Sequence, residues 1–167
     1  MNYEKLVQGI LNIGEAMLQS GAEIFRVEDS LYRMCKSYGF VRYDVFVIPS
    51  NIQVTVETPE GRIITQIRHI ETTGADYDKL NYLNALSRYV CSHRPNEKEL
   101  IRRFEKVMSR PDQSELITGI AQLTGGTAFA VFFGCDFQDA VVALGVSLMI
   151  VLVGKWLGKR EGNPMIY

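Results

Sequence analysis

The residues best suited to chemistry are charged side chains at the start of an expected helix. Residues 21–28 place Glu23, Arg26 and Glu28 close behind Gly21. Glu23 and Arg26 stand three positions apart, a spacing at which opposite charges on a helix can pair. Glutamates near a helix N-terminus also complement the helix dipole, so a solvated, well-capped helix start explains the same pattern. The spacing alone leaves a structural and a functional role open.

Metal and nucleophile chemistry find little support in the sequence. Cys91, His93 and His69 lack the second spaced pair of ligands that a zinc site needs. The sequence has no glycine-rich phosphate-binding loop, and serines near histidines do not define a catalytic triad without a fold. We expect no metal, no cofactor and no catalytic residue.

Composition argues against nucleic acid as a partner. The 167 residues carry a net charge of only -1, and no basic run with interleaved aromatic residues occurs.

The three widely spaced cysteines are typical of free thiols in a reducing compartment. An acid at Glu4 and the lack of a long apolar run before Glu15 argue against a cleaved signal peptide.

The elements that must position the charged residues form an α+β domain over residues 1–112. Apolar residues at helical spacing predict four amphipathic helices, at about residues 6–17, 24–38, 76–90 and 96–108. Alternating apolar residues predict three strands, at about residues 41–47, 52–57 and 62–70. We therefore expect a small three-stranded antiparallel sheet flanked by helices that cover one face.

Residues 113–167 are expected to form a transmembrane helical hairpin and the start of a further link. The uncharged run 117–133 is about 25 Å long as a helix, near the minimum for a bilayer core. A second run, about 140–157, ends with a lysine and a tryptophan, which favour the membrane interface. Basic residues flank the pair and the link 134–139 has none, so both ends should be cytoplasmic. Because each run is short, two buried helices of a soluble core remain the alternative.

The first of these runs contains a patch of polar and small residues. Its members are Gln122, Thr124, Gly125, Gly126 and Thr127. Such residues serve both helix packing and substrate paths in membranes, and packing is the simpler interpretation. Asp136 and Asp139 in the link fit either a solvated turn or a rim that attracts protons or substrate.

Several motifs follow one another in a recognisable order. They are Gly-Ala-Glu-x-x-Arg-Val-Glu after an apolar helix, Ile-Pro-Ser-Asn-Ile between strands, an arginine at the end of the sheet, and residues 78–88 on the next helix. With these motifs the chain resembles the N-terminal half of the threonine/serine exporter (ThrE-like) family over essentially its whole length. The positions that match the motifs are Gly21, Glu23, Arg26, Glu28, Pro49, Ser50, Arg68, Asn84 and Arg88.

The resemblance implies an exporter of small polar metabolites in the bacterial inner membrane, with a cytoplasmic N-terminal domain. Threonine, serine or a dicarboxylate such as succinate would be the substrate, and an ion gradient the energy source. Its partners would be membrane lipid and either missing membrane helices or a second membrane subunit, in a homo- or hetero-oligomer. Since the chain stops after two expected spans, we expect a truncated gene product or an expressed fragment.

The motif residues have two interpretations. Acids and arginines gathered at one end of the sheet could form an internal charge network, because buried charges need partners. Alternatively, they could form a gating or substrate-screening surface. Two other functions stay open: a membrane-anchored hydrolase, since the family's N-terminal domain is sometimes described as hydrolase-like, and a soluble α+β binding module whose last helices pack in a core or an oligomer interface.

Overall fold

The computed structural model describes residues 2–111 and 115–158 of the chain. The chain divides into two compact units, which we call unit 1 (Met1–Pro111) and unit 2 (Asp112–Tyr167). Each unit is described by itself below.

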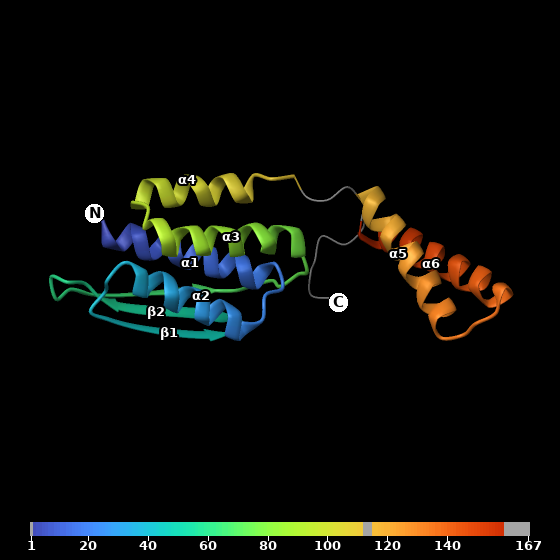
Figure 1. The fold of residues 1–167 in the computed structure, drawn as a ribbon, viewed down its shortest axis with the longest axis horizontal. Helices are drawn as coiled ribbons and strands as arrows, with labels where there is room; N and C mark the ends of the chain where they lie inside the picture. Colours follow the sequence, from blue (N-terminus) through green and yellow to red (C-terminus); the bar gives the residue numbers. More distant parts are fainter. Residues whose placement is uncertain (1, 112–114, 159–167) are drawn as a thin grey trace. The chain divides into compact units, whose positions relative to one another are not determined.

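The described residues of unit 1 form four helices and three strands, and Figure 1 shows their arrangement. In chain order they are α1 (Tyr3–Gln19), α2 (Ile24–Ser37), β1 (Arg42–Ile48), β2 (Asn51–Glu57), β3 (Ile63–His69), α3 (Tyr77–His93) and α4 (Glu97–Met108). The strands pair antiparallel in the order β1-β2-β3, with Val45 opposite Val54 and Val56 opposite Ile64. The expected α+β class and three-stranded antiparallel sheet are confirmed.

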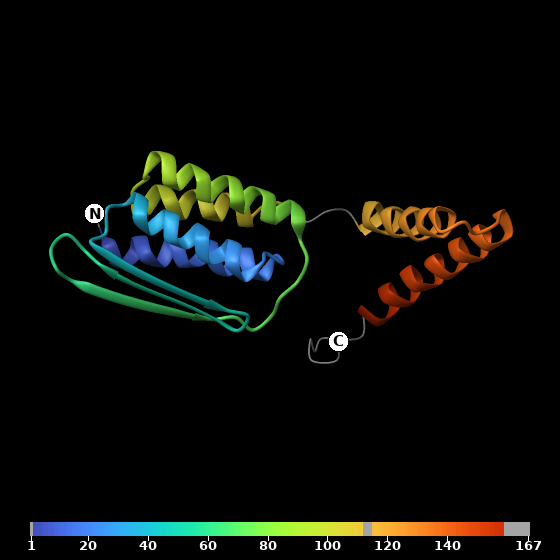
Figure 2. The ribbon, with the colours of Figure 1, turned by 60° about the horizontal axis from the view of Figure 1, so that its bottom comes forward.

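The helices of unit 1 lie on one face of the sheet, in two layers (Figure 2). α1 and α2 pack against the strands, while α3 and α4 pack against that pair of helices. α1 lies between the sheet and the outer helices, and ten of its residues are buried. Its sequence is correspondingly apolar around most of its circumference, as a helix contacted on several sides must be.

The core of unit 1 is formed by alternate strand residues and by the apolar stripes of the helices. Ile52, Val54 and Val56 of β2, which packs against α1, are fully buried. Val27 and Leu31 of α2, which packs against β1, are fully buried as well. The period of two in the strands places the next residues on the opposite face, where Phe46, Ile63 and Ile67 are exposed. The sheet is thus held by burial on its helix-covered face.

Unit 2 consists of two packed helices, α5 (Glu115–Phe132) and α6 (Phe137–Gly158). The link between them is shorter than expected, because residues 137–139 form the first turn of α6 and the backbone already turns at Gly134. Hydrogen bonds from the backbone N–H of Gly134 to Val131 and of Cys135 to Ala130 close the end of α5.

Length and composition qualify one helix of the described residues as a membrane span. It is α6, whose segment Phe137–Gly154 has a mean hydropathy of 2.0, and 6% of that segment is buried. The apolar part of α5, Leu116–Phe132, is shorter than such a span. The expected pair of helices exists, but a transmembrane hairpin is not confirmed by it.

Candidate functional site

A groove between α2 and α3 is lined by polar side chains from both helices. It consists of two adjoining hollows, of about 200 and about 500 Å³, which share Arg26 and Asn84. The smaller hollow is lined by Met17, Gly21, Ala22, Glu23, Arg26, Tyr77, Leu80 and Asn84. The larger hollow is lined by Phe25, Arg26, Asp29, Ser30, Arg33, Asn84, Ser87, Arg88, Cys91 and Ser92. We call the two together the α2–α3 groove.

Gly21 sets the entry into the α2–α3 groove from α1. It has a positive φ of 87°, and its N–H bonds to Leu18 while the N–H of Ala22 bonds to Met17. These two bonds form a Schellman motif, which usually requires glycine at this position. The motif reverses the chain so that α2 starts beside the end of α1.

Glu23 and Arg26 lie in the smaller hollow, but they do not form the pair that their spacing predicts. Glu23 is the N-cap residue of α2, and its side chain makes no capping hydrogen bond. Within the described residues, neither side chain has an ion-pair partner. The pairing that their spacing allows is thus not formed, and both side chains are exposed to solvent.

The α2 side of the groove includes two charged residues that the motifs do not contain. Asp29 and Arg33 form an ion pair of 2.9 Å, with side chains 41% and 69% exposed. Both lie on the same face as Arg26, at positions i+3 and i+7 along the helix. A search for polar residues at helical spacing from Arg26 would have found them.

The α3 side presents polar residues at the same helical period. Asn84, Ser87, Arg88, Cys91 and Ser92 line the larger hollow. The hydroxyls of Ser87 and Ser92 donate to the backbone carbonyls of Asn84 and Arg88, both at 2.9 Å. Within the described residues, the guanidinium of Arg88 forms neither a hydrogen bond nor an ion pair.

The thiol of Cys91 is a poor nucleophile in this setting. Burial raises its pKa, although the nearby Arg33 lowers it. A thiol with a raised pKa is protonated at neutral pH, and the thiolate is the reactive form. The groove can therefore bind polar groups, but Cys91 gives no sign of activation for chemistry.

Four of the motif residues lie outside the lining of the groove. Glu28 is half-buried on α2, and Pro49 and Ser50 form the exposed β1–β2 turn. Arg68 contacts Glu15 of α1 at 3.5 Å, and both side chains are 27% exposed. The Arg68 guanidinium also donates to Asn12 at 3.3 Å, so this residue ties β3 to α1. The structure thus joins Gly21, Glu23, Arg26, Asn84 and Arg88, and separates Arg68 from them.

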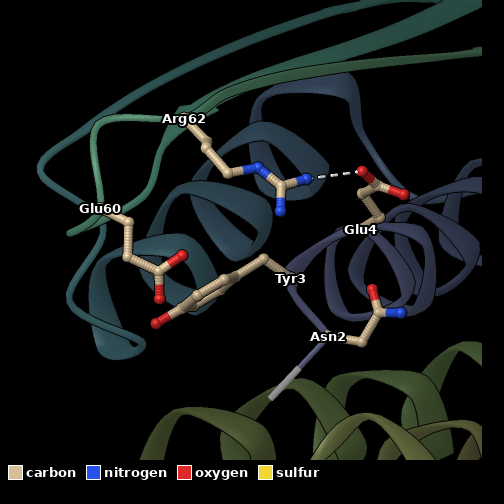
Figure 3. A pocket seen from close by; sticks show the side chains of 5 residues that line it. All are labelled: Asn2, Tyr3, Glu4, Glu60 and Arg62. Carbon is tan, nitrogen blue, oxygen red and sulfur yellow. Dashed lines mark hydrogen bonds and ion pairs between the residues drawn. The ribbon is translucent and has the colours of Figure 1, made fainter.

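A third hollow, of about 440 Å³, lies apart from the α2–α3 groove, where the first turn of α1 meets the β2–β3 connection. Figure 3 shows Arg62 reaching toward Glu4, and their ion pair measures 2.8 Å. The side chain of Gln66 donates to the backbone carbonyl of Glu4 at 2.9 Å. Because Glu4 and Arg62 pair with each other, we interpret these contacts as a structural link between α1 and the sheet.

The polar patch of unit 2 is divided between helix packing and the exposed surface. The hydroxyls of Thr124 and Thr127 donate to carbonyls of the preceding turn of α5. A Cβ at Gly126 would collide with Ser147 of α6, whereas one at Gly125 would meet nothing. Gln122 is exposed.

Within the described residues, no three His, Cys, Asp or Glu side chains lie together in a way that could hold a metal ion.

Comparison with known proteins gives one result. The model of the ThrE family, described as a threonine/serine exporter, matches residues 8–167, which is nearly the whole chain. This match confirms the resemblance seen in the motifs. No curated protein and no solved structure matches the chain.

Proposed function

Because the chain belongs to the threonine/serine exporter family, we propose that it is a component of a membrane exporter for threonine, serine or a small dicarboxylate. The main support for this proposal is the extent of the family match. The matched residues include both the polar unit 1 with its α2–α3 groove and the apolar unit 2 with α6.

The proposed arrangement places unit 1 in the bacterial cytoplasm and α5 and α6 in the inner membrane as a hairpin. The distribution of basic residues supports this arrangement. Three of them precede α5, namely Arg102, Arg103 and Lys106, while the α5–α6 link contains no lysine or arginine. Basic residues favour the cytoplasmic side of a membrane. The apolar side chains of α5 and α6 are largely exposed within the structure, as lipid-facing or helix-facing residues would be.

Two helices cannot by themselves enclose a path for a polar molecule. We therefore include further membrane helices in the proposal, supplied by a second subunit or by other copies of the chain. We include an ion gradient as the energy source in the proposal, as the resemblance to the exporter family implies. The α2–α3 groove would be the cytoplasmic surface that contacts the exported molecule before it enters the membrane.

The test is efflux from the native host, in which any partner subunits are present. Deleting the gene should lower the rate at which cells release threonine, serine or succinate after loading, and the intact gene should restore it. A protonophore should abolish the restored efflux. Restoration by Arg26→Gln should be several-fold weaker than by the wild type.

The matched control is Arg42→Gln, which removes the same charge from the outer face of the sheet. Arg42 pairs with Asp44 there at 3.0 Å, with both side chains mostly exposed, so efflux should be unchanged. Equal efflux in deleted and intact cells for all three compounds would contradict the proposed function. Equal efflux with Arg26→Gln and wild type would contradict only the role of the groove.

A further inference from the structure

The sheet of unit 1 has an outer face, turned away from the four helices of that unit (Figure 2). Large apolar side chains on this face are exposed to solvent. They are Phe46 (59% exposed), Ile48 (37%), Ile63 (73%) and Ile67 (53%). Apolar side chains that gather on one exposed face mark an interaction surface.

The strand register arranges the side chains of the outer face in four rows. In order along the strands, the rows are Ile48–Asn51–His69, Phe46–Gln53–Ile67, Asp44–Thr55–Thr65 and Arg42–Glu57–Ile63. The central strand β2 contributes a polar side chain to every row, whereas the apolar side chains lie on the edge strands β1 and β3. The outer face is therefore apolar along both sides and polar along its middle.

We propose that the outer face binds the outer face of a second copy of this chain, about a two-fold axis parallel to the strands. Such an axis places β1 of one copy over β3 of the other and keeps each row over itself. Phe46 then packs on Ile67 of the second copy, and Gln53 meets Gln53, whose amides both donate and accept. Sheets packed in this way lie about 10 Å apart. The inference goes beyond the proposed function, because it does not involve the exported molecule.

The composition of the rows selects this axis over the one perpendicular to the strands. A perpendicular axis through the centre of the face would reverse the order of the rows and set Phe46 against Asp44 and Ile67 against Thr65. Burial of a carboxylate against a phenyl ring is costly. The parallel axis instead sets apolar side chains on apolar ones and amides on amides.

A lipid surface fits the outer face less well than a second copy does. Surfaces that bind anionic lipid carry several lysines or arginines beside their apolar residues. Arg42 is the single lysine or arginine among the strand residues of the outer face, and it is paired with Asp44 at 3.0 Å. The face thus lacks the free positive charge that lipid headgroups would attract.

The association should be weak, because the outer face is small. Each strand has seven residues, so the face measures about 23 Å by about 14 Å, less than the about 800 Å² per partner of a standard interface. Glu57 would also face Glu57 of the second copy, at the end of the face where the twist between packed sheets moves the strands apart. A covalent trap is therefore the suitable measurement.

The trap is Gln53→Cys in the full chain, combined with Cys91→Ser and Cys135→Ser, while Cys35 stays buried. The chain is kept in a neutral detergent with micelles in excess over protein, and a bismaleimide that spans about 10 Å matches the distance between packed sheets. Gln53→Cys should give several-fold more covalent dimer than Glu105→Cys in the same background. Glu105 is equally exposed, but it lies on α4, which packs against α1 and α3.

Two charge substitutions test which residues meet across the axis. Phe46→Glu and Ile67→Lys should each lower the cross-linking at residue 53 several-fold, because each buries an unpaired charge. A mixture of the two variants should recover it as heterodimer, since the introduced carboxylate and ammonium then face each other. Ile63→Lys is the matched control for Ile67→Lys. It is the same change on the same strand and face, two rows away, and it should give no recovery with Phe46→Glu.

Mass spectrometry separates the heterodimer from the two homodimers, and circular dichroism verifies that each variant is folded. The inference is overturned if Gln53→Cys cross-links no more than Glu105→Cys. It is also overturned if Ile67→Lys and Ile63→Lys give the same amount of heterodimer with Phe46→Glu. Because the readout does not involve transport, loss or retention of efflux leaves it unchanged.

Discussion

Gly21 is the residue on which the geometry of the α2–α3 groove depends most directly. Its φ of 87° places it in the left-handed region, and a Cβ at this position would lie 2.7 Å from the carbonyl oxygen of Gly74. Gly74 in turn donates its N–H to Gln19 at 2.9 Å, so the two loop segments hold each other closely. A side chain at residue 21 would have to separate them.

We predict that Gly21→Ala lowers the free energy of unfolding of unit 1 by about 2 kcal/mol or more. A left-handed backbone costs a non-glycine residue about 1–2 kcal/mol, and the contact with Gly74 adds to it. Urea unfolding followed by circular dichroism measures the change.

Gly39→Ala is the control for the backbone contribution. Gly39 has a φ of 74°, but a Cβ there would have nothing within 4 Å. Its loss of stability should therefore be the smaller of the two. Equal losses in both variants would show that the approach of Gly74 contributes nothing.

At the scale of elements, the helices contact each other in two different ways. α2 and α3 face each other across polar stripes at positions three and four apart, and these stripes line the α2–α3 groove. α5 and α6 approach through small residues, with Gly126 against Ser147. Small residues let membrane helices pack closely, so Gly126 is a packing residue in this arrangement.

We predict that Gly126→Ile loosens the packing of α5 on α6, whereas Gly125→Ile does not. The two glycines are neighbours on one helix, so the substitutions have the same effect on helix propensity. A Cβ at residue 126 would meet Ser147 of α6, whereas a Cβ at residue 125 would have nothing within 4 Å. The chain's one tryptophan, Trp156, lies on α6. Its fluorescence during thermal unfolding in detergent should show a lower midpoint for Gly126→Ile alone.

At the scale of the whole molecule, the three cysteines report on the proposed arrangement in the membrane. Cys135 is exposed in the α5–α6 link, and Cys91 is half-buried in unit 1. Cys35 is buried, and desolvation raises its pKa to about 12, so its thiol is neutral and inaccessible at physiological pH. Cys35 can therefore remain in every variant.

We predict that a membrane-impermeant maleimide labels Cys135 in intact cells and labels Cys91 only after the cells are permeabilised. Cys91→Ser leaves Cys135 as the accessible thiol, and Cys135→Ser leaves Cys91, whose raised pKa should make its labelling slower. Mass spectrometry of the chain gives the extent of labelling. Protection of both thiols until permeabilisation would contradict the proposed hairpin. Labelling of Cys91 in intact cells would contradict a cytoplasmic unit 1.

Local patterns in the sequence were sufficient for the elements and for the family. The helical stripe at Leu6, Ile10, Ile13 and Met17 and the alternation through β2 follow from burial of one face, which depends only on the period of the element. The motif order predicted the family, which the match over residues 8–167 confirms. Helix ends were less predictable, and α6 starts at Phe137 within the expected link.

Only the tertiary structure decided which charged residues share a site. Arg26 and Arg88 are 62 positions apart in sequence, and they meet because α2 and α3 pack side by side. The same packing leaves Glu23 and Arg26 unpaired despite their spacing, and it assigns Arg68 to Glu15 of α1. Periodicity records which face of an element is buried, but it contains no information about which element covers that face. The composition of the groove therefore depends on long-range packing.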